Sequence, residues 1–485
     1  MNGPLPSPSA TGVRIAGDHY QWQLAWLACL GVVRDALTHQ PNPSVRVGVE
    51  VDDAGNLDDV VVYRQRPPHT YQQVKYTVDA STPVNFAYLA APSPQGGPSI
   101  LAKINASRAK LGHSAELHLV TNRAPDPSDP LISSRDTRTG LLVPRGAAGG
   151  PQSERGQARA KWADSIGVSE PELLDLLGAL RFDLARDPAQ LHETLSLTML
   201  VTGLRGDPAA IEAGVSWIAQ QVRYGYRVLD QAMITEAIDT LALRAGPART
   251  VISIATLKPD PLASQAQLTL DWVDRFEGED PYLKRRPKPP ASWSELQADI
   301  EAIPTHLAGA DHVVVTGSLR LAPAFAVGAA LRMVTNTDIA VLQREQIWSS
   351  DTHYSAPLQP TATSLAVDQG PDLAIAVSVA TGLTDDVLEY LKDTGSPVGT
   401  LLTLAPPNGA FDRSVASPAE ANALAAGIRD AARRAAKGHP RIHLFLAAPM
   451  GLALLIGHRW NRVAPTIVYE DLKDARYEAA FTVSA

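Results

Sequence analysis

The stretch DDVVVYRQRPPHTYQQVKYTV (Asp58–Val78) decides the fold of the N-terminal half. Its two β-branched and aromatic runs, separated by a Pro-Pro turn, predict a β-hairpin. Gln73 and Lys75 are two residues apart in the second run, so their side chains point to the same face. Strand pairing can bring Asp59 opposite that face. Asp58 stays open as the alternative, because a register slip of one residue exchanges the faces.

Two earlier segments add polar candidates to this hairpin. The run SVRVGVEV predicts a strand that ends near Glu50, a further oxygen donor, and the helical pattern DHYQWQLAWLACLGVVRDAL carries Gln21. Carboxylate and carbonyl oxygens suit Mg²⁺ or Mn²⁺, and a lysine can offset charge on a phosphate. These residues therefore predict a metal-dependent phosphodiesterase site. For Gln73 and Lys75 alone, a solvated edge strand without any catalytic role remains the alternative.

The composition excludes several classes of protein. The chain has 485 residues, 19% of them charged, and a net charge of −8, so we expect two or three domains and no general polyanion binder. No run reaches about 18 apolar residues, and the N-terminus lacks the pattern of a secretion signal. The single cysteine, Cys29, excludes an internal disulfide and predicts a buried thiol. We therefore expect a cytoplasmic protein that does not enter a membrane.

Shifts in composition predict the domain boundaries. Before the Pro-rich stretch YLKRRPKPPASW, strands and helices form the first domain, and after it apolar strands alternate with helices. Such alternation is typical of a doubly wound parallel sheet in an α/β fold. The predicted parts are a flexible arm at 1–16, a first domain at 17–245 with a mobile loop at 133–160 and a helical part at 161–243, a connector at 246–292 and a second domain at 293–485.

Ligands of doubly wound sheets bind beyond the carboxyl ends of the strands. The loops TGSLRLAPA, APPNGAFDR and AAPMG fit that position, and none is a Walker or GxGxxG loop. Small residues there let backbone N–H groups approach a phosphate. Phe325 has helical apolar neighbours typical of a core, whereas Trp348, expected in a polar loop after a strand, is the better stacking candidate. Arg320 could add a phosphate contact. The candidate ligand residues in and near these loops are Gly317, Ser318, Arg320, Phe325, Trp348, Ala448, Pro449 and Met450.

The N-terminal motifs GDHYQ, VE, DDVVV and QVK resemble the PD-(D/E)xK nuclease superfamily, whose fold is that of restriction endonucleases. More narrowly they resemble the endonuclease domain of bacterial antiphage effectors, in which Gln replaces the Glu of E-x-K. The segment LVTNRAPDPSDPL resembles the part that follows this core. The resemblance implies that Asp59 and Gln73 bind the metal, that Glu50 assists, and that Lys75 polarises the attacking water.

The C-terminal half resembles the SAVED domain, a sensor of two fused Rossmann-type, CARF-like units. The motifs that carry this resemblance are GSLRLAPAFAVGAAL, REQIWSSD, HLFLAAPMGLALLIGHRWN and TIVYE, the last of which contains the further ligand candidate Tyr469. Both halves together resemble the endonuclease–SAVED effectors of CBASS antiviral defence. This implies a cyclic oligonucleotide activator, with cyclic trinucleotides among the family's ligands, made by a partner nucleotidyltransferase. It also implies a homo-oligomer that cleaves double-stranded DNA.

Two other functions stay open from the sequence. The first is a non-catalytic sensor of cyclic nucleotides with a degenerate nuclease fold, against which the presence of Asp59, Gln73 and Lys75 argues. The second is an enzyme whose C-terminal half acts on the nucleotide itself, for example by opening its ring. No cluster of His, Ser and Asp in the sequence supports this second function.

Overall fold

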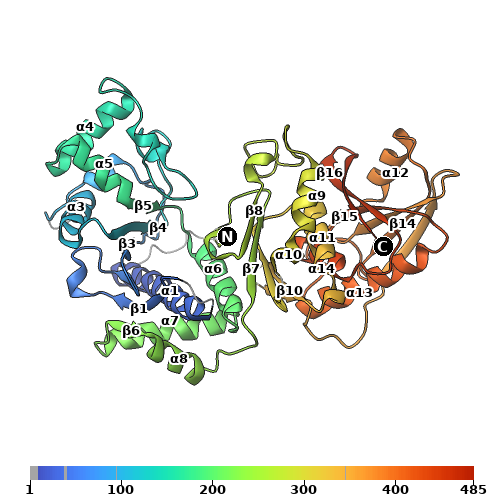
Figure 1. Ribbon diagram of the computed structural model, residues 1–485, viewed down its shortest axis with the longest axis horizontal. Helices are drawn as coiled ribbons and strands as arrows, with labels where there is room; N and C mark the ends of the chain where they lie inside the picture. Colours follow the sequence, from blue (N-terminus) through green and yellow to red (C-terminus); the bar gives the residue numbers. More distant parts are fainter. Residues whose placement is uncertain are drawn as a thin grey trace, which may run out of the picture. The chain divides into compact units, whose positions relative to one another are not determined.

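The computed structural model describes residues 9–37, 41–93, 96–260, 262–307, 309–343 and 346–484. The chain divides into two compact units, Met1–Gly246 and Pro247–Ala485, coloured from blue to green and from yellow to red in Figure 1. Residues 1–8 of the predicted arm, and Arg344 and Glu345 of the REQIWSSD motif, lie outside the described residues. The rest of the arm is helical, because α1 (Ala10–Leu37) begins directly after Ser9, whose side chain caps it.

The first unit contains a six-stranded sheet in the order β5-β4-β3-β2-β1-β6. The pairs β6-β1, β1-β2 and β2-β3 are antiparallel, and β3-β4 and β4-β5 are parallel, so the sheet is mixed. The predicted hairpin is confirmed as β2 and β3. The strands are β1 (Ser44–Val49), β2 (Val60–Arg64), β3 (His69–Lys75), β4 (Ala115–Thr121), β5 (Leu180–Asp183) and β6 (Val228–Asp230).

Helices cover the two faces of this sheet with separate cores. One core contains Val49 and Val60 with the apolar side of α1, including the buried thiol of Cys29, and the other contains Leu117 and Leu119. Side chains at successive positions of a strand therefore enter different cores. The helices after α1 are α2 (Phe86–Ala90), α3 (Ile100–Leu111), α4 (Glu154–Ile166), α5 (Glu170–Ala179), α6 (Pro188–Val201), α7 (Pro208–Arg223) and α8 (Gln231–Thr240).

The segment 133–160, predicted as a mobile loop, is folded onto the first unit. Its Arg159 is 3% exposed. The guanidinium of Arg159 donates to the carbonyl oxygens of Gly146 and Ala148 and pairs with Glu170 at 2.5 Å. These bonds compensate the burial of the charge and fix the loop. Composition alone missed this, because Gly- and Arg-rich sequence is typical of linkers as well.

The second unit contains two sheets, in the orders β11-β10-β9-β7-β8 and β12-β14-β13-β15-β16-β17. Parallel pairs such as β9-β10 and β13-β15 confirm the predicted α/β class, and β11, β12 and β17 pair antiparallel. Their strands are β7 (Thr250–Ala255), β8 (Leu268–Asp271), β9 (His312–Thr316), β10 (Asp338–Gln343), β11 (Gln346–Ser349), β12 (Thr361–Ala366), β13 (Asp372–Ser378), β14 (Val398–Ala405), β15 (Ile442–Ala447), β16 (Thr466–Lys473) and β17 (Arg476–Val483).

The predicted connector at 246–292 belongs to the first of these sheets. It supplies β8 and also β7, which lies between β9 and β8. Ile252 and Ile254 of β7 are fully buried, so the compact unit extends back to Pro247. The helices of this unit are α9 (Trp293–Glu301), α10 (Ile303–His306), α11 (Leu321–Ala330), α12 (Thr384–Asp393), α13 (Pro418–Ala435) and α14 (Met450–Arg459).

Helices α11 and α14 cross at very short range through two glycines. A Cβ atom on Gly328 would lie 2.1 Å from the carbonyl oxygen of Leu454, and one on Gly457 would lie 2.1 Å from that of Phe325. Only glycine permits such an approach of two backbones. The two glycines end the segments VVVTGSLRLAPAFAVG and LFLAAPMGLALLIG, which look alike in the sequence and whose second halves form most of α11 and α14.

Among the helices of the described residues, none combines the length and the apolar character needed to cross a membrane.

Candidate functional site

The register of the first sheet brings the predicted catalytic residues to one place. Val60 lies opposite Gln72 on β3 and opposite Val49 on β1. The backbone N–H of Glu50 donates to the carbonyl of Asp59 at 3.4 Å, which extends the ladder by one residue. Since antiparallel pairs place opposite residues on the same face, Asp59 meets both Glu50 and Gln73.

Hydrogen bonds fix Asp59 against β3. Its Oδ2 atom accepts from the side-chain amide of Gln73 and from the backbone N–H of Val74, the latter at 2.6 Å. Because Gln73 donates its N–H, its amide oxygen is the atom that could bind a cation. Lys75 lies two residues further along β3 and shares the face of Gln73. The register therefore places Asp59, and not Asp58, beside Gln73.

The electrostatics of this site suit a cation. Burial raises the pKa of the Asp59 carboxyl, while the charge of Lys75 and the hydrogen bond from Val74 offset part of that effect. Burial thus disfavours the ionised carboxylate, and a bound cation would stabilise it. Carboxylate and amide oxygens are the ligands that Mg²⁺ and Mn²⁺ prefer, so Asp59, Gln73 and Glu50 fit such a metal.

Glu50 stands at the end of β1 in a conformation that is unusual for its residue type. Its φ angle is +53°, in the left-handed region that side chains with a Cβ rarely adopt. Three contacts hold it there: Gln21 donates to its carboxylate at 3.4 Å, Arg227 donates to its carbonyl, and its N–H binds Asp59. Gln21 also donates to the carbonyl of Asp59 at 3.2 Å, so α1 reaches the site as predicted.

In the second unit, the loop after β9 carries three predicted ligand residues. Gly317 has a φ angle of +97°, and the carbonyl of Ser318 accepts from the N–H of Thr256 at 2.9 Å. The guanidinium of Arg320 pairs with Glu470 at 2.7 Å. Burial raises the pKa of Glu470, and Arg320 opposes this rise. The charge of Arg320, predicted to contact a phosphate, is thus already countered by a buried carboxylate.

Trp348 lies with the residues around the start of α14. It belongs to strand β11 and is only 4% exposed, so its expected place in a polar loop is wrong. The backbone of β11 pairs with β10, and the indole lies over Gly451, whose N–H donates to the side chain of Gln343 at 2.9 Å. Three further predicted residues, Ala448, Pro449 and Met450, directly precede Gly451 at this helix start.

Phe325 and Tyr469 are core residues in this structure. Phe325 is fully buried and its ring meets Trp460 edge-on with 5.3 Å between centroids. Tyr469 stacks on Phe445 and shares a 2.9 Å hydrogen bond with His443. Burial also raises the pKa of the Tyr469 hydroxyl to about 12. Since Tyr469 and its neighbour Glu470 point to opposite faces of β16, Tyr469 lies away from Arg320.

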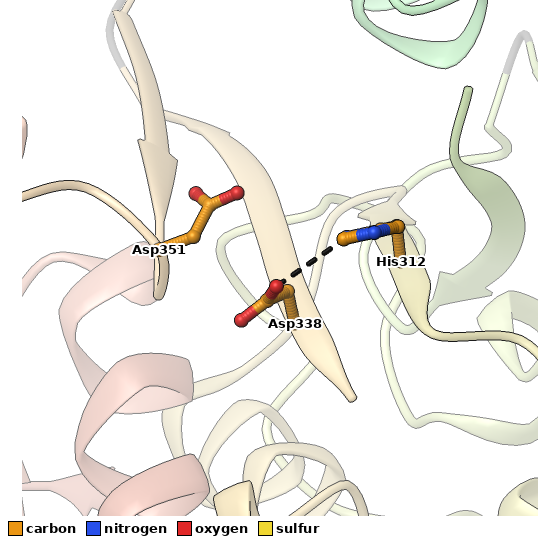
Figure 2. A group of neighbouring side chains, drawn as sticks. All are labelled: His312, Asp338 and Asp351. Atoms are coloured by element: carbon orange, nitrogen blue, oxygen red, sulfur yellow. Dashed lines mark ion pairs between the residues drawn. The ribbon is translucent and has the colours of Figure 1, made fainter. Parts of the chain in front are cut away.

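A third polar cluster, His312, Asp338 and Asp351, lies at the amino end of β9 and β10 (Figure 2). One ligand atom from each lies within 4.8 Å of the others, and His312 Nδ1 is 3.4 Å from Asp338. Asp351 pairs with the buried guanidinium of Arg249 at 2.9 Å. Burial alone would raise the pKa of Asp351, but the hydrogen bond from Ser349 and the charge of Arg249 hold it below its usual value. The ion pair with Arg249 accounts for Asp351, whereas the buried Nδ1 atom of His312 has no hydrogen-bond partner among the described residues.

Sequence reasoning missed Glu470 and Gln343, which hold the two candidate ligand loops. Glu470 was visible as an acidic residue at the end of the strand motif TIVYE, where it interrupts an apolar run. Gln343 carried no comparable signal, because a glutamine near the end of a strand is common at protein surfaces. Arg227, which holds Glu50, lies in a segment that showed only helical patterns.

Comparisons with known proteins bear on both units. The structure aligns with that of an Acinetobacter baumannii Cap4 SAVED/CARF-domain containing receptor with the cyclic trinucleotide 3′3′3′-cAAA, at 15% identity and a TM-score of 0.42, over 99% of this chain and 100% of that one. The structure of a Moraxella osloensis Cap4 SAVED/CARF-domain containing receptor aligns at 14% identity with a TM-score of 0.39, over 97% of this chain and 99% of that one.

The sequence is also similar to CD-NTase-associated protein 4 of Enterobacter hormaechei subsp. hoffmannii (strain UCI 50). The two are 21% identical over 96% of this chain and 98% of the relative, so the similarity includes both units. Residues 296–483 match the family described as "SMODS-associated and fused to various effectors sensor domain". The C-terminal part of this chain is therefore a SAVED domain.

Proposed function

We propose that this chain is an antiphage effector whose SAVED domain binds a cyclic oligonucleotide and thereby activates metal-dependent cleavage of double-stranded DNA by the first unit. The observation that carries the nuclease part is the register, which gathers Glu50, Asp59, Gln73 and Lys75 at one end of β1 to β3. Unrelated surface residues would not be expected to share a face and a hydrogen-bond network.

Each residue has a role that follows from its contacts. Asp59 and the amide oxygen of Gln73 would hold the metal, with Glu50 as the third ligand and Gln21 orienting Glu50. A bound divalent cation supplies Lewis-acid polarisation of the phosphate and lowers the pKa of water. Lys75 would hold the attacking water and offset charge on the phosphate. The neutral Gln73 provides less charge than a glutamate, so the metal affinity of the site depends chiefly on Asp59 and Glu50.

The sensor part of the proposal is supported by the SAVED domain and by the similarity to a CD-NTase-associated protein. The activator is a cyclic oligonucleotide, for which cyclic trinucleotides are the first candidates, made by a nucleotidyltransferase that accompanies the effector. Ligand binding would promote assembly of several copies. Clustering would raise the affinity for DNA of a chain whose net charge is −8.

Replacing Lys75 by alanine tests the nuclease. We expect the rate of plasmid cleavage with Mg²⁺ and activator to fall by about 100-fold or more, because the residue that positions water is lost. Gln72→Ala is the matched control, since Gln72 is the neighbouring residue on the same strand but points to the opposite face. Cleavage by the Lys75→Ala variant at the parental rate, or parental cleavage that persists in EDTA, would exclude this active site.

A thermal-shift screen with cyclic di-, tri- and tetranucleotides tests the sensor. A ligand that binds only the folded state stabilises it by about 2.7 kcal/mol at 100 times its Kd. We expect at least one cyclic trinucleotide to raise the melting temperature, while the matching linear trinucleotide has a smaller effect. If no cyclic oligonucleotide shifts the melting curve, the sensor half of the proposal fails and the nuclease half is still tested by Lys75→Ala.

A further inference from the structure

The run RYGYRV (Arg223–Val228) between α7 and β6 is exposed at each of its six positions. Tyr224 is 67% exposed and Tyr226 is 55% exposed. Aromatic side chains normally bury most of their large apolar surface. Two exposed tyrosines in one turn, flanked by Arg223 and Arg227, are therefore more typical of a contact surface than of a structural turn.

This turn lies beside the candidate active site. The N–H of Val49 donates to the carbonyl of Arg227 at 2.8 Å, and the guanidinium of Arg227 donates to the carbonyl of Glu50. In the sheet, β6 is followed by β1 and then by β2, which Asp59 directly precedes. Two strand spacings amount to about 10 Å, roughly the distance spanned by two or three nucleotides of a duplex strand.

The chemistry of the turn suits a nucleic acid. Arginine side chains bind phosphate oxygens, and aromatic rings stack on bases of any sequence. The hydroxyl of Tyr224 accepts a hydrogen bond from Gln220 at 3.1 Å, which ties this ring to α7. The hydroxyl of Tyr226 makes no hydrogen bond with any residue that the structure describes, so its ring is available to a ligand.

We propose that Arg223–Val228 is a DNA-contact element that positions the substrate for the first unit. Arg223 contacts a phosphate next to the cleaved one, and the ring of Tyr226 packs against a base or sugar of the same strand. Arg227, bonded to the Glu50 carbonyl and 3.9 Å from the Asp52 carboxylate, ties the turn to the site. This inference rests on the proposed nuclease function. It adds a substrate-positioning surface that none of the nuclease motifs GDHYQ, VE, DDVVV and QVK contains.

The test measures binding of a fluorescein-labelled 20-base-pair duplex to the full chain by anisotropy. Both proteins carry Lys75→Ala, so that the DNA is not cleaved in Mg²⁺. The Lys75→Ala protein is compared with the variant that also carries Arg223→Gln and Tyr226→Ala, between 50 and 200 mM salt. We expect the Kd to rise about tenfold and the slope of log K against log salt to fall by about 1, because one phosphate contact and one stacking contact are lost. Both replaced residues are exposed, so the melting temperature should stay unchanged.

Two control variants are matched to the two changes. Arg155→Gln removes an exposed arginine from α4 of the same unit, and Tyr282→Ala removes a tyrosine that is 80% exposed in the second unit. Neither change should alter the Kd or the salt slope beyond a factor of two. A loss of affinity in Arg155→Gln as large as that in the double variant would show a general effect of charge and would overturn the inference.

The remaining outcomes separate this inference from the proposed function. If the unmodified protein cleaves DNA and the Lys75→Ala protein binds it, but adding Arg223→Gln and Tyr226→Ala leaves the Kd and the salt slope unchanged, only the inference is wrong. If neither the unmodified protein nor the Lys75→Ala protein binds DNA, with or without the cyclic trinucleotide 3′3′3′-cAAA, the inference and the nuclease function both fail. If the double variant alters the sedimentation coefficient instead of the DNA affinity, the turn is an interface between copies, and the inference is overturned.

Discussion

His458 is a fully buried histidine whose environment opposes its protonation. Burial lowers its pKa from 6.5 to about 4, and the hydrogen bond to the carbonyl of Leu331 offsets only a part of this shift. The folded state therefore binds a proton less tightly than the unfolded state does. This difference in pKa stabilises the folded state fully above pH 6.5, and the stabilisation is lost as the pH falls from 6.5 toward 4.

The variant His458→Asn removes this titration while its amide N–H can still reach Leu331. A pKa difference of this size corresponds to about 3 kcal/mol of unfolding free energy between pH 7 and pH 4. We expect the parent to lose more stability over this range than the variant, although the variant is less stable at pH 7. Urea unfolding of both proteins at pH 7.5, 6, 5 and 4.5 measures the two slopes. Equal slopes would contradict the assignment.

At the scale of residues, strand alternation was enough to predict which side chains of the candidate site on β3 share a face. Gln73 and Lys75 were assigned by their spacing, and pairing geometry limited their partner to Asp58 or Asp59. The choice between the two needed the register, which short strands do not specify by themselves. Trp348 was misplaced because the strand before it is interrupted by polar residues, which suggested a loop.

At the scale of elements, the crossing of α11 and α14 depends on the absence of side chains at two positions. Replacing Gly328 by alanine would place a Cβ 2.1 Å from the backbone of Leu454, so the helices must move apart. We expect the variant to be less stable by about 2 kcal/mol or more, because backbone atoms cannot yield as a side chain can. Thermal or urea unfolding measures the difference.

Gly178 in α5 is the matched control for this prediction. It is an exposed helical glycine, and a Cβ there would meet nothing within 4 Å. Alanine at this position should stabilise the protein by about 0.5 kcal/mol, since glycine costs more backbone entropy in a helix. Opposite signs for the two substitutions would support the close crossing, whereas a stabilised Gly328→Ala variant would contradict it.

Sequence patterns predicted long elements better than short ones. Helix α13 and strands β13 and β15 have strong periodicity or continuous apolar runs, and they agree with the alternation of apolar strands and helices predicted for this part of the chain. Strands β5 and β6 are four and three residues long and lie among helices, so their alternation was too short to detect. These strands form the two edges of the sheet, and β6 directly follows the turn that lies beside Glu50.

At the scale of the whole molecule, the limits of the second unit decide which fragments fold. A fragment 247–485 retains β7 between β9 and β8, whereas a fragment 293–485 lacks both β7 and β8. In the shorter fragment, the edge of β9 that pairs with β7 would be exposed, and so would the apolar side chains that pack against Ile252 and Ile254 in the whole unit. We expect the longer fragment to unfold cooperatively and the shorter one to aggregate or to lack a near-UV circular dichroism signal. Cooperative unfolding of 293–485 would contradict this limit.

The ion pair between Arg320 and Glu470 has a consequence for how this protein can change over generations. The two residues lie 150 positions apart, yet their charges compensate each other in the interior of the second unit. A mutation that removes the guanidinium of Arg320 leaves the buried carboxylate of Glu470 without a counter-charge, and loss of one partner of a buried ion pair typically costs 3–5 kcal/mol. Related sequences should therefore keep or replace both residues together, so that the loop after β9 and the end of β16 evolve as a single inherited unit.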